Sequence, residues 1–316
     1  MSKGKVKADL LLLLAAAIWG FAFVAQRVGM DYVGPFTYNG VRFSLGILVL
    51  LPFLYYKLRK REQLVYTGNT AERRRIFAGS LVTGLLLFAG VALQQLGLKT
   101  TTAGKAGFLT ELYVAFVPVI GLFFGQRNNW FIWAGVLLSM AGLYLLCINR
   151  GFSLAAGDSL VLMCSFVFSF HVLIIGWLSP KMDSILLAII QFSVTTLLNL
   201  VVAFALEPVS TIKIMEAWLP IAYGGILSVG LAYTLQVMAQ KTAHAAYVSI
   251  ILGLEAVFAV IGGMLLLGET MSMRMLGGCA LMLAGTILVQ IKGESTYSGS
   301  EVAKSKKRSS ENQIAR

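Results

Sequence analysis

Ten runs of predominantly apolar residues, each about twenty residues long, follow one another along the chain with short polar segments between them. A helix rises about 1.5 Å per residue, so a run of this length crosses a hydrocarbon core of about 30 Å. Only a helix satisfies its backbone hydrogen bonds within such a short lipid-embedded segment. We therefore predict an all-α integral membrane protein with ten transmembrane helices, at residues 8–28, 36–56, 76–98, 106–125, 129–148, 155–178, 184–206, 216–240, 246–268 and 272–291.

The amino-acid composition supports lipid as the solvent of this chain. Of its 316 residues, 58% are hydrophobic and 13% are charged, whereas soluble domains average about 45–50% apolar and about 25% charged residues. Few connections between the predicted spans exceed ten residues, so we expect no inserted globular domain. Residues 293–316 are rich in Ser, Lys and Glu and are predicted to form a disordered cytoplasmic tail.

The net charge of +12 could indicate a nucleic-acid partner, but the positions of the basic residues argue against one. Of the 26 Lys and Arg residues, nineteen fall on the side of the N-terminus, five fall on the opposite side, and two lie within spans. Excess positive charge marks the cytoplasmic side of a membrane protein. We therefore expect a multi-pass protein of the plasma (inner) membrane with both termini in the cytoplasm, and basic clusters that contact anionic lipid.

The two halves of the chain resemble each other. A shift of 149 residues aligns Arg42-Phe43-Ser44 with Gln191-Phe192-Ser193, and a shift of 144 residues aligns Glu111 with Glu255. Each match is weak by itself, but the order and the nearly constant offset hold across all five spans of each half. The pattern indicates an internal repeat.

Five spans is an odd number, so the second repeat must enter the membrane from the side opposite to the first. We predict two inverted five-helix repeats, at residues 1–150 and 151–292. Secondary transporters use inverted repeats for alternating access to a central site, whereas an enzyme or a receptor has no need of this symmetry. The repeat is the main sequence evidence for transport.

Several short motifs resemble those of the drug/metabolite transporter superfamily, in its ten-span EamA-like family. The resemblance extends from about residue 10 to residue 290, and the residues that carry it are Ala17-Ile18-Trp19-Gly20, Arg42-Phe43, the run from Thr101 to Phe108, Pro118, Leu254-Glu255-Ala256 and Gly268-Glu269. Ala256 stands where the family has a proline, and Gln126 stands where the first half often has a glutamate. The resemblance implies transport of a small metabolite, such as an amino acid, through a central cavity.

Three charged residues inside spans are candidate substrate-binding groups, because an ionisable side chain at mid-membrane costs about 2.5–3.5 kcal/mol on insertion scales and usually faces a cavity. Glu111 and Glu255 occupy matched places in the two repeats. Two interpretations are open. In the first, these carboxylates bind a substrate cation or a proton; in the second, each is a buried structural group that pairs with a neighbouring span. Lys105 begins the fourth span, and it either binds an anionic group or extends its ammonium to water at the membrane surface.

Uncharged polar and aromatic side chains complete the predicted cavity. Trp19 shares one face of the first span with Phe23 and Gln26 and lies too deep for an interfacial anchor. Arg42 is expected to form a structural pair, because its repeat mate is the uncharged Gln191. The remaining candidates for substrate contact are Gln95, one of two consecutive glutamines that point to different faces, Tyr113, His171, Tyr233 and Gln236.

Missing motifs argue against several other functions. The sequence has no Walker-type Gly-rich loop for ATP and no His-Glu-x-x-His metal motif, and it has no Gly-x-Ser-x-Gly nucleophile motif. We therefore expect no enzymatic activity, no cofactor and no metal.

The leading hypothesis is a secondary transporter of a small organic metabolite that works by alternating access around a central cavity. A zwitterion such as an amino acid would suit the opposite charges of Lys105 and Glu111, and protons or a counter-substrate are the candidate coupling partners. The first alternative is a nucleotide-sugar or phosphorylated-metabolite antiporter, which would need several cations in the cavity. The second is a membrane-embedded enzyme or receptor, whose reactive site would lie in one half.

Overall fold

A computed structural model describes residues 3–67, 69–101, 103–147, 156–267 and 272–293; a few side chains within these ranges, including that of Lys105, lie outside the description. The described part of the chain is helical throughout, apart from turns and one isolated β-bridge. Its elements are α1 (Lys3–Gly29), α2 (Pro35–Arg59), α3 (Thr70–Gly97), α4 (Ala103–Glu111), α5 (Tyr113–Phe123), α6 (Trp130–Cys147), α7 (Ala156–Leu178), α8 (Ser184–Leu206), α9 (Thr211–Glu216), α10 (Trp218–Ala222), η1 (Tyr223–Tyr233), α11 (Thr234–Ala239), α12 (Ala245–Leu252), α13 (Glu255–Leu267), α14 (Met273–Leu288) and η2 (Val289–Gly293).

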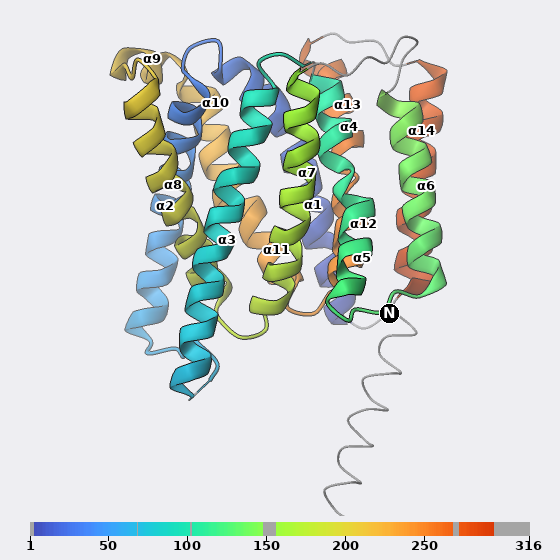
Figure 1. The fold of residues 1–316 in the computed structure, drawn as a ribbon, viewed down its shortest axis with the longest axis horizontal. Coiled ribbons are helices and arrows are strands. Elements are labelled where there is room, and N and C mark those ends of the chain that lie inside the picture. The colour runs from blue at the N-terminus through green and yellow to red at the C-terminus, as the bar shows by residue number, and fades with distance from the viewer. Residues whose placement is uncertain (1–2, 68, 102, 148–155, 268–271, 294–316) are drawn as a thin grey trace, which may run out of the picture.

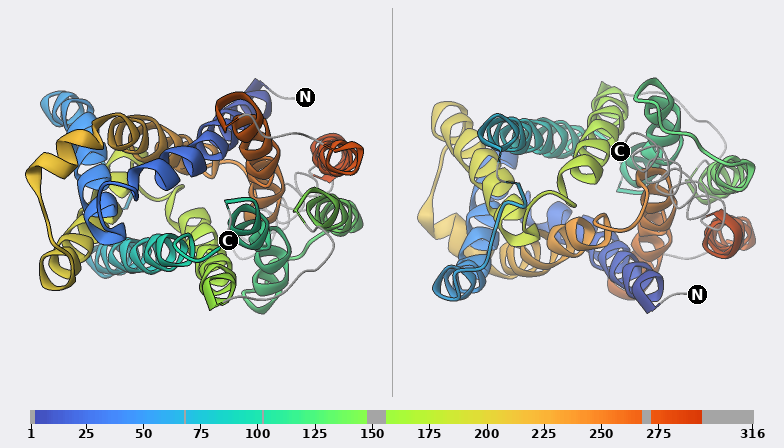
Figure 2. Two further views of the ribbon diagram at one scale, coloured as in Figure 1. Left: turned by 90° about the horizontal axis from the view of Figure 1, so that it is seen from above. Right: turned by 90° about the horizontal axis from the view of Figure 1, so that it is seen from below.

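Among these residues, eight helical stretches are long and apolar enough to cross a membrane, and two shorter apolar helices lie at Leu109–Phe123 and Trp130–Leu145. Together they correspond to the ten predicted spans, which confirms the all-helical membrane fold. The helices lie roughly side by side in one bundle (Figure 1). Viewed along the bundle, α6 and α14 form a pair at one edge, apart from the remaining helices (Figure 2). The Gly268-Glu269 motif lies outside the described residues, as does the predicted tail from residue 294 onward.

Within the described residues, three of the ten spans depart from a regular α-helix in their interior, and the tenth ends in the π-helical segment η2. The fourth span is interrupted at Leu112, between α4 and α5, and the ninth is interrupted at Gly253 and Leu254, between α12 and α13. The eighth span passes from α10 through the π-helical segment η1 into α11. Irregular helical backbone inside a membrane protein is tolerated where it lines a cavity, and π-helical turns occur frequently at functional sites.

The two ends of the α2–α8 pair are held by different contacts. At one end, Asp183 caps α8 through the backbone N–H groups of Ile185 and Leu186, and its carboxylate lies 3.2 Å from Nζ of Lys57 at the end of α2. At the other end, Glu207 at the end of α8 accepts hydrogen bonds from the first turn of α2. Each contact joins the first half of the chain to the second.

Candidate functional site: a polar and aromatic cavity between the two halves

A small cavity of about 50 Å³ lies in the middle of the bundle. It is smaller than the sites of about 300 to 1,000 Å³ that usually hold small organic ligands, so binding of such a ligand would require the lining to move apart. Both halves of the chain contribute to the lining, which consists of Trp19, Gln26, Arg42, Gln94, Thr110, Tyr113, Phe168, His171, Val172, Ser228, Tyr233, Gln236, Leu252 and Glu255. Two interrupted spans border the cavity, and Ser228 and Tyr233 belong to the π-helical segment η1.

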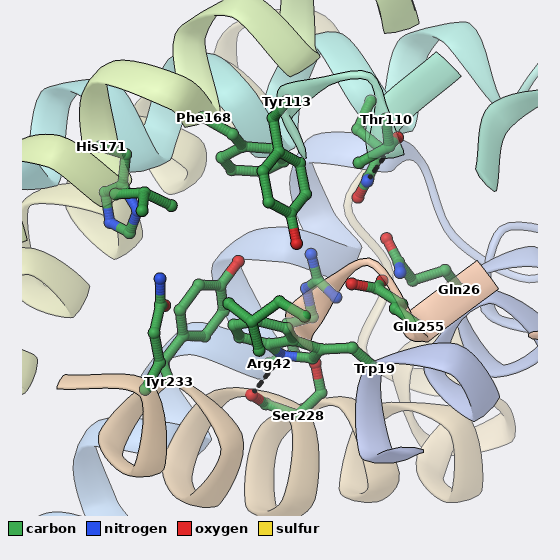
Figure 3. A pocket seen from close by; sticks show the side chains of 14 residues that line it. Trp19, Gln26, Arg42, Thr110, Tyr113, Phe168, His171, Ser228, Tyr233 and Glu255 are labelled. Carbon is green, nitrogen blue, oxygen red and sulfur yellow. Dashed lines mark hydrogen bonds between the residues drawn. The ribbon is translucent and has the colours of Figure 1, made fainter. Parts of the chain in front are cut away.

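One wall of the cavity is aromatic. The rings of Trp19 and Tyr233 meet edge to face, with centroids 4.6 Å apart. The indole Nε1–H of Trp19 donates a 3.1 Å hydrogen bond to the carbonyl oxygen of Ser228 on η1 (Figure 3). Phe43 and Phe192 pack behind Tyr233, with centroids 6.1 and 5.9 Å from its ring. These contacts hold Trp19 of the first half against η1 of the second half.

The two matched glutamates lie close together at the interrupted spans. Glu255 begins α13 and lines the cavity, whereas Glu111 ends α4 and is fully buried behind it. Glu255 and Tyr113 are close enough to Glu111 to interact with its carboxyl group electrostatically. Neither oxygen of Glu111 receives a hydrogen bond from a described donor. Two ionised carboxylates at this separation repel each other, so a shared proton or a bound cation stabilises the pair.

Arg42 is the cation of this cavity among the described lining residues. Its side chain is 3% exposed and its guanidinium lies over the rings of Tyr38 and Phe43, at 5.3 and 5.2 Å from their centroids. Figure 3 shows the guanidinium pointing into the space between Tyr113, Trp19 and Glu255.

Several amide groups around the cavity are only partly satisfied. The side-chain carbonyl oxygens of Gln26 and Gln236 are buried and accept no hydrogen bond from a described residue. By contrast, His171 is paired: its Nε2 lies 2.9 Å from Oε1 of Gln191. Gln94 donates a 3.2 Å hydrogen bond to the hydroxyl of Thr110. The cavity therefore offers two amide acceptors for a polar ligand.

The structure brings six of the nine predicted contact residues to the cavity lining: Trp19, Tyr113, His171, Tyr233, Gln236 and Glu255. Glu111 lies one layer behind them. Gln95 turns away from the cavity, and its Nε2 donates to the backbone oxygen of Gln26 at 3.5 Å, whereas its neighbour Gln94 lines the cavity. The side chain of Lys105 lies outside the description.

Other lining residues were missed at the level of sequence. Arg42 was predicted to form a structural ion pair, but the ion pairs of the described residues do not include it. The sequence does indicate that Gln26 could line the cavity, because a spacing of seven residues places it on the same helical face as Trp19. The sequence alone does not indicate the other lining residues, because apolar and small polar side chains are common on every face of a membrane helix. These residues are Thr110, Phe168, Val172, Ser228 and Leu252.

Comparison with known proteins identifies the family. The model of the EamA-like transporter family matches residues 6–148 and again residues 155–291. The chain belongs to this family. The two matched segments correspond to the two five-span halves, and the EamA-like membership also confirms the resemblance noted from the sequence motifs.

Individual relatives agree with this assignment. An uncharacterized transporter of Archaeoglobus fulgidus is 29% identical over 294 residues, which cover 91% of this chain and 87% of the relative. The uncharacterized transporter YoaV of Bacillus subtilis is 21% identical over 290 residues, covering 90% and 96% of the two chains. A WAT1-related chloroplastic protein of Arabidopsis thaliana is 26% identical over 288 residues, covering 86% and 66%.

A solved structure shares the fold of this EamA-like chain. Its title reads only "Crystal structure of protein", and it superimposes with a TM-score of 0.73 over 92% of this chain and 98% of its own, at 18% sequence identity. The chain is thus a multi-pass membrane protein of a transporter family.

Proposed function

We propose that this protein is a secondary transporter that moves a small organic metabolite across the membrane by alternating access around the central cavity. The observation that carries the proposal is the composition of the cavity, which combines side chains of both halves, a cation and a carboxylate. Inverted repeats that share one site near the membrane centre are typical of secondary transporters. A membrane-embedded enzyme would instead concentrate its reactive groups in one half.

The charged groups of this cavity suit a zwitterion such as an amino acid. Arg42 and Glu255 both line it, and no ion pair of 4 Å or less joins them. Because Arg42 and Glu255 do not form an ion pair with each other, Arg42 can bind an anionic group of a ligand and Glu255 can bind a cationic group. Arg42 thereby takes the role that the sequence suggested for Lys105, and Glu255 takes the role suggested for Glu111.

The nucleotide-sugar or phosphorylated-metabolite alternative is less well supported by the cavity. Recognition of a phosphate or pyrophosphate group usually employs several cations or a bidentate cluster of arginines. Arg42 is the single cation among the described lining residues.

The basic residues support an orientation in the plasma (inner) membrane with both termini in the cytoplasm. Loop 60–69 and the start of α3 carry a cluster of Arg and Lys, and so does the N-terminus. Positive charge is retained on the cytoplasmic side. In this orientation the Lys57–Asp183 contact faces the cytoplasm, and the Glu207 contact faces the outside.

The close approach of Glu111 and Glu255 supports coupling to protons. A proton shared by the two carboxyl groups would be released when a substrate ammonium binds Glu255, so substrate and proton would move in opposite directions. Exchange against a counter-substrate is the alternative coupling mode.

The purified protein reconstituted into proteoliposomes tests this function. Vesicles are loaded with a mixture of small metabolites, and efflux of each compound is followed by mass spectrometry with and without an imposed pH gradient. We expect protein-dependent movement of at least one small zwitterion, abolished by Glu255→Gln and unchanged by Glu216→Gln, because Glu216 is exposed at the end of α9, away from the cavity. Equal efflux from protein-containing and empty vesicles for all compounds would refute the proposal.

A further inference from the structure

Arg42 is a buried cation that lacks an anionic partner among the described residues. Its side chain is 3% exposed, and the ion pairs of 4 Å or less within the described part of the chain join Lys57 to Glu62 and to Asp183, not Arg42 to any carboxylate. Its Nε atom is buried and donates to no described acceptor. Buried charges in proteins are normally paired and hydrogen-bonded, so Arg42 departs from the usual pattern.

The neighbours of Arg42 do not replace a counter-ion. The rings of Tyr38 and Phe43 give two cation–π contacts, each of which stabilises a charge by about 0.5–2 kcal/mol, against an insertion cost of about 2.5–3.5 kcal/mol for an arginine at mid-membrane. The rings carry no formal negative charge, and Nε of Arg42 still donates to no described acceptor. The Tyr38 hydroxyl donates to the carbonyl oxygen of Pro220 at 3.1 Å. No anionic group of the described chain therefore offsets this guanidinium.

The residue at the matched position of the second repeat, Gln191, provides a comparison for Arg42. Gln191, which aligns with Arg42, is fully buried and lies 2.9 Å from the imidazole of His171 through its Oε1 atom. It is neutral and held by a partner. Arg42 has the same place in its own repeat, yet it is charged and points into the cavity (Figure 3). A purely structural role would not require the charge.

We propose that Arg42 is the anion-binding residue of the cavity, and that a single carboxylate of the transported compound is its missing counter-ion. The proposal rests on the proposed transport function and adds a substrate class to it: compounds with one carboxylate, with or without an ammonium group, of a size that fits beside Trp19 and Tyr233. The planar guanidinium can donate two parallel hydrogen bonds to the two oxygens of one carboxylate.

Other residues of the cavity could contact the remaining groups of such a ligand. Glu255 and the unpartnered amide oxygen of Gln26 line the same cavity and can accept hydrogen bonds from an ammonium group. The Trp19–Tyr233 wall is left for an apolar side chain. A phosphate would bring about two negative charges to one cation, so the same site selects against phosphorylated compounds.

Three probes of nearly equal shape separate the contributions of the two charged groups. L-Leucine carries both charges, 4-methylpentanoate lacks the ammonium group, and 3-methylbutylamine lacks the carboxylate. Binding of each to the full-length protein in detergent is measured by calorimetry and by the shift of the unfolding midpoint. The variants are Arg42→Gln, Arg42→Lys and the control Arg27→Gln, which removes an exposed cation at the end of α1 by the same substitution.

We expect wild-type protein and Arg27→Gln to bind at least one of the two carboxylate probes more tightly than the amine. Arg42→Gln should weaken the carboxylate probes about 10- to 100-fold, as loss of a charge-assisted hydrogen bond does, and leave the amine within about twofold. Arg42→Lys should lie between, because an ammonium keeps the charge without the planar fork. Equal weakening of all three probes would show that Arg42 only supports the cavity, and that result would overturn the assignment.

The ligand-free protein gives an independent readout. If Arg42 is unpaired in the empty cavity, Arg42→Gln removes an uncompensated buried charge and raises the unfolding midpoint above that of wild type. If Arg42 is a structural residue, the same variant lowers the midpoint. Either a lowered midpoint or failure of both carboxylates to bind wild-type protein contradicts the proposal, as does equal competition by inorganic phosphate or chloride.

The binding and transport experiments distinguish failure of the Arg42 proposal from failure of the transport proposal. Protein-dependent efflux of amines without carboxylate binding would leave the transport function standing and remove the role of Arg42. Arg42-dependent carboxylate binding without any efflux would support the subsite and remove the transport function.

Discussion

Substitution of Gly20 by alanine tests the contact between the two halves next to the cavity. Gly20 follows the cavity residue Trp19 on α1, and α1 packs against α13 of the second half. A Cβ atom at Gly20 would lie 2.5 Å from Cβ of Phe258, 2.7 Å from the backbone nitrogen of Ala259 and 2.7 Å from the carbonyl oxygen of Glu255. These are fixed atoms of α13, so the new methyl group can be accommodated only if the helices move apart.

The structure gives the size of the effect. Ordinary contact begins at 3.4 Å, so α1 and α13 must separate by about 0.7 Å to bring the 2.7 Å backbone contacts to that value. Overpacking of this kind costs about 1–3 kcal/mol. Replacement of glycine by alanine inside a helix gains about 1 kcal/mol in propensity. The net expectation is a protein less stable than wild type by about 0–2 kcal/mol, with Trp19 displaced from its contacts to Ser228 and Tyr233.

Gly277→Ala is the matched control, because Gly277 also lies inside a helix, α14, and a Cβ atom there would meet no atom within 4 Å. This variant should keep the propensity gain and be more stable than Gly20→Ala by about 1–3 kcal/mol. Unfolding midpoints in mild detergent and efflux from proteoliposomes provide the comparison. Equal stability of the two variants would mean that α1 and α13 do not pack as described, and the reasoning would be refuted.

Three further predictions follow from the described contacts. Trp19→Phe should weaken substrate binding about fivefold through loss of its hydrogen bond to Ser228, worth about 1 kcal/mol, whereas Trp130→Phe, at a position exposed on α6, should leave binding unchanged. Because Glu255→Gln is expected to abolish efflux itself, Glu111→Gln tests the coupling: it should reduce the response of efflux to a pH gradient with little change in substrate affinity, because Glu111 is not among the lining residues; a full response would exclude Glu111 from coupling. Glu207→Ala should lower the free energy of unfolding by about 1–2 kcal/mol as a lost helix cap does, with Glu216→Ala as the exposed control, and unchanged stability would count against the cap.

The fold was predictable from the sequence because lipid imposes strong constraints. Span length depends on the apolar character of whole segments, and the ten spans predicted from it correspond to eight long apolar helices and two shorter ones among the described residues. The interruptions at Leu112 and at Gly253 were not predicted. Glu111 and Glu255 flank them, but a charged residue in a span does not by itself show that the backbone hydrogen bonding of the helix is interrupted.

The site was harder to predict, because helical spacing gives the relative but not the absolute direction of side chains. Gln94 and Gln95 illustrate this: the sequence shows that they face different ways, and only the packing of α3 shows that Gln94 faces the cavity. Arg42 was expected to form a structural pair, and the ion pairs of the described residues do not include it. Its neutral repeat mate Gln191 suggested a structural role, but pseudo-symmetry preserves the place of a side chain and not its partner, and His171 is the partner of Gln191 alone.

The repeat symmetry also relates the two ends of the α2–α8 pair. Asp183 precedes α8 as Gly34 precedes α2, and these positions differ by the same 149 residues that align Arg42 with Gln191. Asp183 caps its own helix, whereas Gly34 has no side chain to do so, and Glu207 of the other half supplies the acceptor instead, at 2.9 Å from the amide nitrogen of Phe36 and 2.7 Å from that of Thr37.

Contacts thus join α2 to α8 at both ends. Under the alternating access proposed above, opening to either side would break the contact at that end and keep the other. Asp183→Ala should then favour opening at the end of Lys57, and Glu207→Ala should favour opening at the end of Phe36. A cysteine introduced at Ser228, in a background without the three native cysteines, should react faster with a membrane-impermeant thiol reagent from opposite sides in the two variants. Faster labelling from the same side in both would show that the α2–α8 contacts do not separate the two open states.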